Sequence, residues 1–315
     1  MTVPPRRLGS TDIVTIPLTL GGNVFGWTAD RAASFSILDA FVANGGTFID
    51  TADSYSRWVP GHSGGESETM IGQWLAASGA RSKVRIATKV GAMAGLSPTQ
   101  ISAGCDASLR RLGIDCIDLY FAHCDDLDTP QEDALEAFAA LIAAGKIRAI
   151  GASNFAVPRL QSARSLAETM GLPIVKVLQP RYNLVERDEY EGAMQAHCLA
   201  HGVGVVPHSG LASGFLTGKY RSLSDIEGAA RSARLAPHFD AAGLAVLAVL
   251  AEVAEETGAT PAQVSLAWLA AQPGVVAPIA SATSAAQVEE LVASTELALD
   301  DQQLGRLDAA GRRPG

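Results

Sequence analysis

Four residues that could together carry out acid–base chemistry lie at the ends of three short apolar segments. The segments GGTFIDTADSY, VRIATKV and IDLYFAH carry, in order, Asp50 with Tyr55, Lys89 and His123. If the three segments are parallel neighbours in one barrel, these side chains converge, because such barrels place their active sites at the C-terminal ends of the strands.

A carboxylate, an ammonium, a phenol and an imidazole suit the reduction of a carbonyl group. The developing alkoxide needs a proton, and a phenol with a pKa near 10 is a poor donor at neutral pH. A nearby ammonium stabilises the phenolate, and a carboxylate keeps the ammonium charged. We therefore expect Tyr55 to be the acid, Lys89 to tune it, Asp50 to anchor Lys89, and His123 to align the carbonyl.

Each of these residues also has a structural explanation when it is considered alone. Asp50 could cap a loop through an Asx turn, Tyr55 could be a loop aromatic, and His123 could be a core histidine. Lys89 is harder to explain in this way, since lysine is seldom buried unless it is paired. The combination favours chemistry.

The elements that must position these residues alternate regularly along the chain. Helical patterns begin after Asp30 and recur over 68–77, 98–112, 130–144, 158–170, 189–200, 242–256, 261–271 and 285–294. Strands are expected at 15–20, 47–50, 84–89, 117–123, 149–153, 174–179, 203–208 and 275–279. This order predicts an α/β fold, a (β/α)8 TIM barrel.

The competing fold is a doubly wound open sheet, which usually carries a GxGxxG turn after its first strand, and residues 21–26 lack that spacing. We expect one barrel domain over 1–315, with a β-hairpin over 7–13. A long loop insertion after strand seven, 209–239, is expected to act as a functional cover.

Bulk composition excludes several classes of partner. The 24 basic and 33 acidic residues give a formal charge of −9, which repels nucleic acids and anionic membrane surfaces. The N-terminus lacks an apolar signal region and no apolar run is long enough to cross a bilayer, so we expect a cytoplasmic protein. Cys105, Cys116, Cys124 and Cys198 show no metal-binding spacing and are expected to be buried free thiols, with no metal site.

In combination, several motifs resemble the aldo-keto reductase superfamily over nearly the whole chain, in its bacterial and potassium-channel β-subunit-like branches. They are FIDTADSY, GESETMIG, IATK, DLYFAH, GKIRAIGASNF, LQPRYNL, SGLASGFLTGKY and PIASATSAAQVEE. The resemblance implies catalysis by Asp50, Tyr55, Lys89 and His123. It also implies a nicotinamide dinucleotide lying extended across the barrel mouth.

The resemblance further implies a set of cofactor-binding positions. Gly22 and Asn23 follow the first strand, and Ser153, Asn154 and Gln179 match the residues that hold the carboxamide. The pyrophosphate cover matches Ser209, Gly210, Leu211, Ser213 and Lys219, and the adenosine pocket matches Ser281, Thr283, Gln287 and Glu290. His208 replaces the usual stacking Tyr or Trp, Gly210 stands where Pro is common, and Leu291 replaces the usual Asn beside the adenine.

The choice between NADP(H) and NAD(H) depends on basic residues. The segment from Ala277 to Glu290 contains no Lys or Arg, which favours NAD(H). The insertion after strand seven, however, contains Lys219, Arg221, Arg231 and Arg234, and related proteins recruit cations from this region. We therefore predict a preference for NADP(H), with Lys219 and Arg231 contacting the 2′-phosphate and NAD(H) as the alternative.

Loop aromatics are expected to form the substrate wall. Val24, Phe25 and Trp27 follow strand one, and Trp58 and His62 lie in the loop over 56–65, although loop hydrophobes that merely cover the rim are an equal reading. Such a wall suits an apolar or ring-shaped carbonyl compound.

The predicted function is an NAD(P)H-dependent oxidoreductase that interconverts a carbonyl, aldehyde or ketone, and an alcohol, with Tyr55 as general acid and base. The alternative is a non-catalytic, cofactor-sensing regulatory subunit of the same fold. A metal-dependent hydrolase is disfavoured because no HxH follows strand one. A Schiff-base lyase is disfavoured because Asp50 would keep Lys89 charged.

Overall fold

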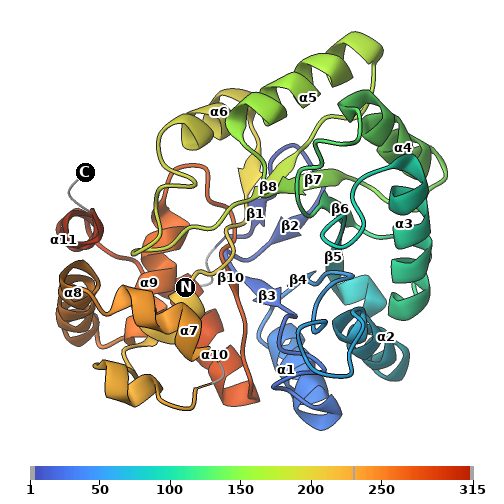
Figure 1. Ribbon diagram of the computed structural model, residues 1–315. Helices are drawn as coiled ribbons and strands as arrows, with labels where there is room; N and C mark the ends of the chain where they lie inside the picture. The colour runs from blue at the N-terminus through green and yellow to red at the C-terminus, as the bar shows by residue number, and fades with distance from the viewer. Residues whose placement is uncertain (1–3, 230, 313–315) are drawn as a thin grey trace.

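A parallel sheet of eight strands, curled into a barrel and ringed by helices, forms the centre of the molecule (Figure 1). This computed structural model describes residues 4–229 and 231–312. The sheet order is β10-β3-β4-β5-β6-β7-β8-β9. Its strands are β3 (Thr19–Gly21), β4 (Phe48–Asp50), β5 (Arg85–Val90), β6 (Leu119–Ala122), β7 (Ile150–Ser153), β8 (Val177–Gln179), β9 (Gly204–Val205) and β10 (Ile279–Ala280).

Backbone hydrogen bonds close the sheet between its two edges. The amide of Val276 donates to the carbonyl of Val205 at 2.8 Å, and that of Ile279 donates to Pro207 at 2.9 Å. The first bond joins β9 to the segment before β10, and the second joins the segment after β9 to β10. The sheet is therefore closed, and the predicted (β/α)8 fold is confirmed.

The ring helices are α1 (Arg31–Ala43), α2 (Glu66–Ser78), α3 (Pro98–Leu112), α4 (Gln131–Ala143), α5 (Val157–Met170), α6 (Ala193–His201), α9 (Pro261–Ala271) and α10 (Ala285–Ala293). Two of them, α3 and α9, have the predicted bounds, and each begins with a proline that suits the first turn. The expected start at 189 for α6 is wrong, because Gly192 has a φ of 81° and the helix begins after it. Helices α8 (Ala241–Thr257) and α11 (Asp301–Gly311) lie together outside the ring (Figure 1). The sequence patterns did not predict α11.

Side chains point alternately into and out of the barrel along each strand, and this explains why Asp50, Lys89 and His123 face the interior. Phe48, Ala87 and Phe121 belong to one buried interior cluster, whereas Ile49 and Tyr120 pack outward against the helices. Side chains two residues apart share a face of a strand. Asp50, Lys89 and His123 each follow an interior residue by two positions, so all three point inward at the C-terminal end.

A hairpin closes the opposite end of the barrel. Strands β1 (Arg6–Arg7) and β2 (Val14–Thr15) pair antiparallel, and Leu8 and Ile13 between them join the interior cluster. The expected strand over 15–20 is wrong in its bounds. Thr15 belongs to the hairpin, and Pro17, which has no amide hydrogen, separates it from β3.

The expected strand over 275–279 is likewise shorter, because Pro278 interrupts the ladder and β10 starts at Ile279. The insertion after β9 contains four short helices, η2 (Ala212–Thr217), η3 (Leu223–Ile226), α7 (Ser232–Leu235) and η4 (Ala236–His238).

Over the described residues, no single helix is long and apolar enough to cross a membrane. The segments 232–238 and 241–257 reach that length and composition only as a pair, and they are bent by 89° relative to each other.

Candidate active site

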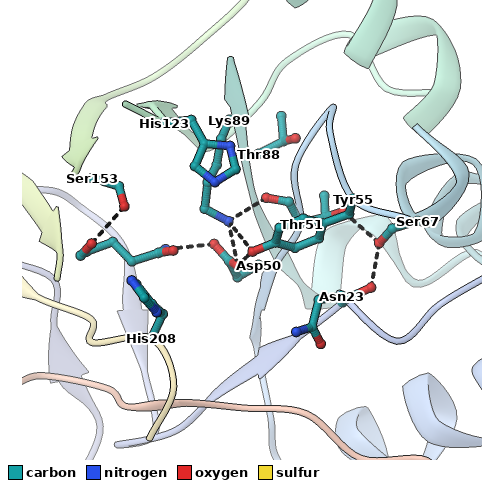
Figure 2. A network of polar contacts seen from close by, with 12 residues as sticks. Asn23, Asp50, Thr51, Tyr55, Ser67, Thr88, Lys89, His123, Ser153 and His208 are labelled. Atoms are coloured by element: carbon teal, nitrogen blue, oxygen red, sulfur yellow. Dashed lines mark hydrogen bonds and ion pairs between the residues drawn. The ribbon is translucent and has the colours of Figure 1, made fainter. Parts of the chain in front are cut away.

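The centre of the site is a buried ammonium that contacts both a carboxylate and a phenol (Figure 2). Lys89 Nζ lies 2.6 Å from Asp50 Oδ2 and 2.9 Å from the Tyr55 hydroxyl, and it also donates to the carbonyl of Thr51 at 2.7 Å. The Tyr55 hydroxyl lies 3.1 Å from the same Asp50 oxygen. Lys89 and Asp50 are buried, whereas Tyr55 is partly exposed at the barrel mouth. The structure therefore brings together the three residues predicted for proton transfer.

Burial and charge act on these groups in opposing directions. Burial lowers the pKa of Lys89, and the adjacent Asp50 carboxylate opposes that change. Burial and then Asp50 hold the pKa of Tyr55 well above its usual range. The Lys89 ammonium, 2.9 Å away, favours the phenolate but does not reverse this rise. Tyr55 therefore keeps its proton at neutral pH, because burial and Asp50 outweigh the effect of Lys89 on its pKa.

His123 faces Tyr55 across the mouth. The two ring centroids are 6.2 Å apart, and His123 Nδ1 lies 3.4 Å from the Ser54 hydroxyl. Burial, with Lys89 and His208 nearby, lowers the pKa of His123 to about 3. A neutral imidazole can align a carbonyl through a hydrogen bond, but it is no source of protons at neutral pH.

A second layer of buried polar groups supports β4 and β5. The Thr51 and Ser67 hydroxyls are 2.7 Å apart, and Ser67 donates to the carbonyl of Gly22 at 2.7 Å. Behind Lys89, buried Glu68 accepts from the Thr88 hydroxyl and from Arg111 Nε at 2.6 Å. These contacts fix the two strands that carry Asp50 and Lys89.

Asp53 is a buried carboxylate that the sequence did not single out. Its side chain is 8% exposed, and its Oδ1 has no hydrogen-bond partner in the described part of the chain. Burial, and then Glu68, raise the pKa of Asp53 to about 6. Only its place in the FIDTADSY motif, two residues before Tyr55, could have drawn attention to it.

The predicted carboxamide site is divided between buried and exposed groups. Gln179 donates its amide to Asp50 Oδ1 at 2.9 Å, and Ser153 donates its hydroxyl to the carbonyl of Gln179 at 2.8 Å. Both residues are almost wholly buried, whereas Asn154 is exposed. Gln179 thus anchors Asp50, a role that the sequence did not indicate, and Asn154 is the member of the set that faces outward.

Strained backbone marks the loop after β9. His208 Nδ1 lies 3.0 Å from the Ser209 hydroxyl, and burial lowers the pKa of His208 to about 4. Ser209, Ala212 and Ser213 have positive φ angles of 60°, 46° and 60°, which non-glycine residues rarely adopt. Such strain concentrates at ligand-binding loops. The loop also contains Gly210, which is buried against Ile279 and Leu266, and Leu211.

The predicted adenosine end lies at the start of α10. Ser281 donates its hydroxyl to Asn23 Oδ1 at 2.8 Å and so joins the ends of β10 and β3. Gln287 Oε1 accepts from the backbone and hydroxyl of Thr283. Glu290 accepts from Thr260 at 2.7 Å and ties α10 to α9. Leu291, which replaces an expected Asn, is buried in the helix–sheet core.

The residues predicted for the substrate wall differ in their exposure. Val24 and Phe25 are 1% and 0% exposed and pack into the core, so their assignment to the wall is wrong. The chain turns inward after Gly22, whose amide donates to the carbonyl of Asp50, and this turn directs both side chains away from the mouth. Trp58 is 46% exposed, and its ring centroid lies 6.2 Å from that of Tyr55 and 5.4 Å from that of Trp27. His62 is partly buried in the same loop, and its Nδ1 has no hydrogen-bond partner among the described residues.

The two predicted phosphate ligands contact different aromatic rings. Lys219 Nζ stacks on the Tyr220 ring at 4.6 Å and lies beside Gly214, within the strained loop. The Arg231 guanidinium instead lies over the ring of Trp27, at 5.5 Å from its centroid.

No group of three or more His, Cys, Asp or Glu side chains that could hold a metal ion occurs among the described residues. All four cysteines are free thiols. Cys105 and Cys198 are buried as predicted, but Cys116 and Cys124 are only partly buried.

Comparisons with known proteins agree over the length of the chain. The family model described as "Aldo/keto reductase family" matches residues 17–312. "Uncharacterized oxidoreductase YrpG" of Bacillus subtilis is 36% identical, covering 98% of this chain and 96% of that protein. "Aldo-keto reductase yakc [NADP(+)]" of Schizosaccharomyces pombe is 31% identical, with 96% and 89% covered. "Probable voltage-gated potassium channel subunit beta" of Arabidopsis thaliana is 31% identical, with 90% and 89% covered.

Proposed function

The chain belongs to the aldo/keto reductase family and is an oxidoreductase by that membership, and we propose that it interconverts a carbonyl compound and an alcohol with Tyr55 as general acid and base. The observation that carries the proposal is the Lys89 ammonium in contact with both Asp50 and the Tyr55 hydroxyl at the barrel mouth. Family membership alone would not assign the chemistry, because one fold serves many functions.

In the reducing direction, Tyr55 gives its hydroxyl proton to the carbonyl oxygen, which becomes the alcohol hydroxyl. The raised pKa of Tyr55 keeps that proton in place until negative charge develops on the substrate oxygen. Lys89 then stabilises the phenolate at 2.9 Å, and Asp50 keeps Lys89 charged. In the oxidising direction, the same phenolate removes the proton from the alcohol.

His123 positions the substrate without taking part in proton exchange. Its imidazole is neutral at pH 7, since its pKa is lowered to about 3. It can therefore hold the carbonyl oxygen beside Tyr55 by a single hydrogen bond. Gln179 holds the second oxygen of Asp50, so that the carboxylate keeps its orientation toward Lys89.

A nicotinamide dinucleotide, when bound, supplies or accepts the hydride at the carbonyl carbon. The residues present fit such a group. Asn154 offers an exposed amide beside the buried polar network, and the strained Ser209–Ser213 segment follows β9 at the C-terminal end of the sheet. At the other end, Ser284 caps the N-terminus of α10, and the backbone amides at the start of a helix suit phosphate oxygens.

We expect NADP(H) to be preferred over NAD(H), with Lys219 as the phosphate ligand. Two observations support this expectation. Lys219 lies beside Gly214 in the loop after β9, and the name of the fission yeast relative includes NADP(+). Lys219→Gln should weaken NADPH binding about tenfold and leave NADH binding within about twofold, as measured by fluorescence titration. Equal losses for the two cofactors would refute the phosphate contact.

The direct test is the oxidation of NADPH and NADH by the purified protein with aldehydes, ring ketones and keto-sugars. Turnover that requires Tyr55 supports the proposal. The similarity to a potassium channel subunit beta keeps a regulatory, non-catalytic role as the alternative. Cofactor binding without turnover of any carbonyl would favour that alternative.

A further inference from the structure

A cation with no anionic partner among the described residues lies beside the aromatic wall. In that part of the chain the Arg231 guanidinium forms no hydrogen bond or ion pair, lies over the face of the Trp27 ring and is close enough to Tyr220 for that hydroxyl to act on its charge. Arg231 is partly buried, and burial lowers its pKa, because a charged guanidinium loses solvation free energy when it is removed from water. By comparison, the partly buried Arg111 and the buried Arg187 both have carboxylate partners.

Three rings connect this cation with the proton donor. Trp27 packs edge to face against Trp58, with centroids 5.4 Å apart, and Trp58 lies 6.2 Å from Tyr55. Trp58 is the exposed ring of this series. One side of the mouth is therefore an aromatic surface with the acid hydroxyl at one end and a guanidinium at the other.

A second cation adds to the positive field. Arg231 caps the N-terminus of α7, and Arg234 lies in that helix. Burial lowers the pKa of Arg231 and of His208, and the charge of Arg234 lowers both further. The chain as a whole carries a formal charge of −9. Positive charge over the mouth of an acidic protein favours entry of an anionic compound there.

We infer that the site takes ring-bearing carbonyl compounds that also carry an anionic oxygen group, a carboxylate above all, and that Arg231 binds this group. The inference rests on the proposed reductase function and names its substrate class. It also replaces the predicted 2′-phosphate contact of Arg231. The Trp27 contact joins the guanidinium to the ring series that leads to Tyr55, and among the described residues Arg231 has no hydrogen bond to Ser281 or Thr283.

The test compares acids with their methyl esters at two lengths, namely 4-formylbenzoate and 4′-formylbiphenyl-4-carboxylate, each against its ester. Arg231→Gln should raise KM for at least one acid about tenfold to a hundredfold, with kcat within about twofold and the esters unaffected. Arg231→Lys should recover part of the loss. Arg221→Gln, an exposed arginine of the same insertion, is the matched control and should change nothing.

A binding experiment tests the role of Arg231 without relying on turnover. In Tyr55→Phe protein, 4-(hydroxymethyl)benzoate and its 4′-biphenyl analogue should quench indole fluorescence, and Arg231→Gln should weaken that binding by the same factor. The other two tryptophans, Trp74 and Trp268, are buried, so the signal reports the wall. Equal changes for acid and ester, or a loss confined to NADPH affinity, would overturn the inference. Turnover of the esters would still uphold the reductase function in that case.

Discussion

Replacement of Tyr55 by phenylalanine separates catalysis from stability. The change removes a hydroxyl that lies 2.9 Å from Lys89 Nζ and 3.1 Å from Asp50 Oδ2. Both partners remain satisfied, because Lys89 still donates to Asp50 and to the carbonyl of Thr51, and Asp50 still accepts from Gln179. The ion pair therefore survives, and only the proton donor is lost.

The expected loss of stability is small, whereas the expected loss of turnover is large. Loss of one hydrogen bond to a charged group costs about 1.5–3 kcal/mol, and the saved desolvation of the hydroxyl offsets part of it, so we expect a loss of about 1–2 kcal/mol in unfolding free energy. Loss of general acid catalysis should reduce turnover at least about a hundredfold. Cofactor affinity should stay within about threefold, because the hydroxyl belongs to the proton-transfer set.

Turnover is followed by the absorbance of the reduced nicotinamide, cofactor binding by fluorescence, and stability by urea unfolding. Tyr190→Phe is a matched control, since it removes a hydroxyl that donates to the carbonyl of Pro273 at 2.7 Å, far from the site in sequence. That control should lose similar stability and keep full activity. A Tyr55→Phe protein that retained more than about a tenth of the turnover would refute the assignment.

Three further predictions follow from the same contacts. Lys89→Met leaves the buried Asp50 carboxylate without its cation and should cost about 3–5 kcal/mol in unfolding free energy, beyond its effect on turnover; a loss below 1 kcal/mol in urea unfolding would contradict the buried ion pair. His208→Tyr should tighten binding of NADPH by about 0.5–1.5 kcal/mol through a larger stacking surface, and unchanged affinity in fluorescence titration would show that His208 does not face the nicotinamide. Asp53 has a folded pKa of about 6, above its unfolded value, so its ionised form destabilises the protein above pH 6. Asp53→Asn should therefore stabilise it by up to about 3 kcal/mol at pH 8 and by nothing below pH 4, and a gain independent of pH would count against this origin.

The positions of three candidate catalytic residues could be predicted because strand geometry is regular. Each of Asp50, Lys89 and His123 stands at the end of an apolar segment, and the alternation of side chains along parallel strands sends all three to one end of the barrel. Prolines at 98 and 261 also allowed two helix starts to be predicted. Proline has no amide hydrogen, and the first turn of a helix is one of the few places where none is needed. Where proline interrupts a strand, as at positions 17 and 278, the pattern of apolar residues overstated the strand length.

Residue type alone does not show whether a polar side chain faces a ligand or forms a hydrogen bond to another residue of the protein. An amide at a strand end, such as Gln179, can face a ligand or a neighbouring carboxylate, and only the inter-strand geometry shows that it contacts Asp50. Val24 and Phe25 were assigned to the mouth because they follow a strand, but a turn that depends on the backbone of Asp50 buries them. The place of Arg231 over Trp27 likewise depends on how a long insertion folds back.

Backbone strain identifies the same end of the barrel without reference to any side-chain chemistry. Within residues 4–229 and 231–312, the non-glycine residues with positive φ are Ser56, Asn154, Ser209, Ala212 and Ser213. All five lie in loops that follow β4, β7 and β9 at the C-terminal end of the sheet, whereas helix ends such as Gly113 and Gly171 adopt the same region with glycine. Each strained residue costs about 1–3 kcal/mol, and glycine would remove most of that cost at any of these positions. Since Ser, Asn and Ala are present instead, their side chains, or the loop stiffness that they impose, have a use at this end of the barrel. Asn154 donates its side-chain amide to the backbone carbonyl of His123, and the Ser209 hydroxyl lies 3.0 Å from His208 Nδ1, so two of the strained residues contact the segments that carry the two histidines of the site.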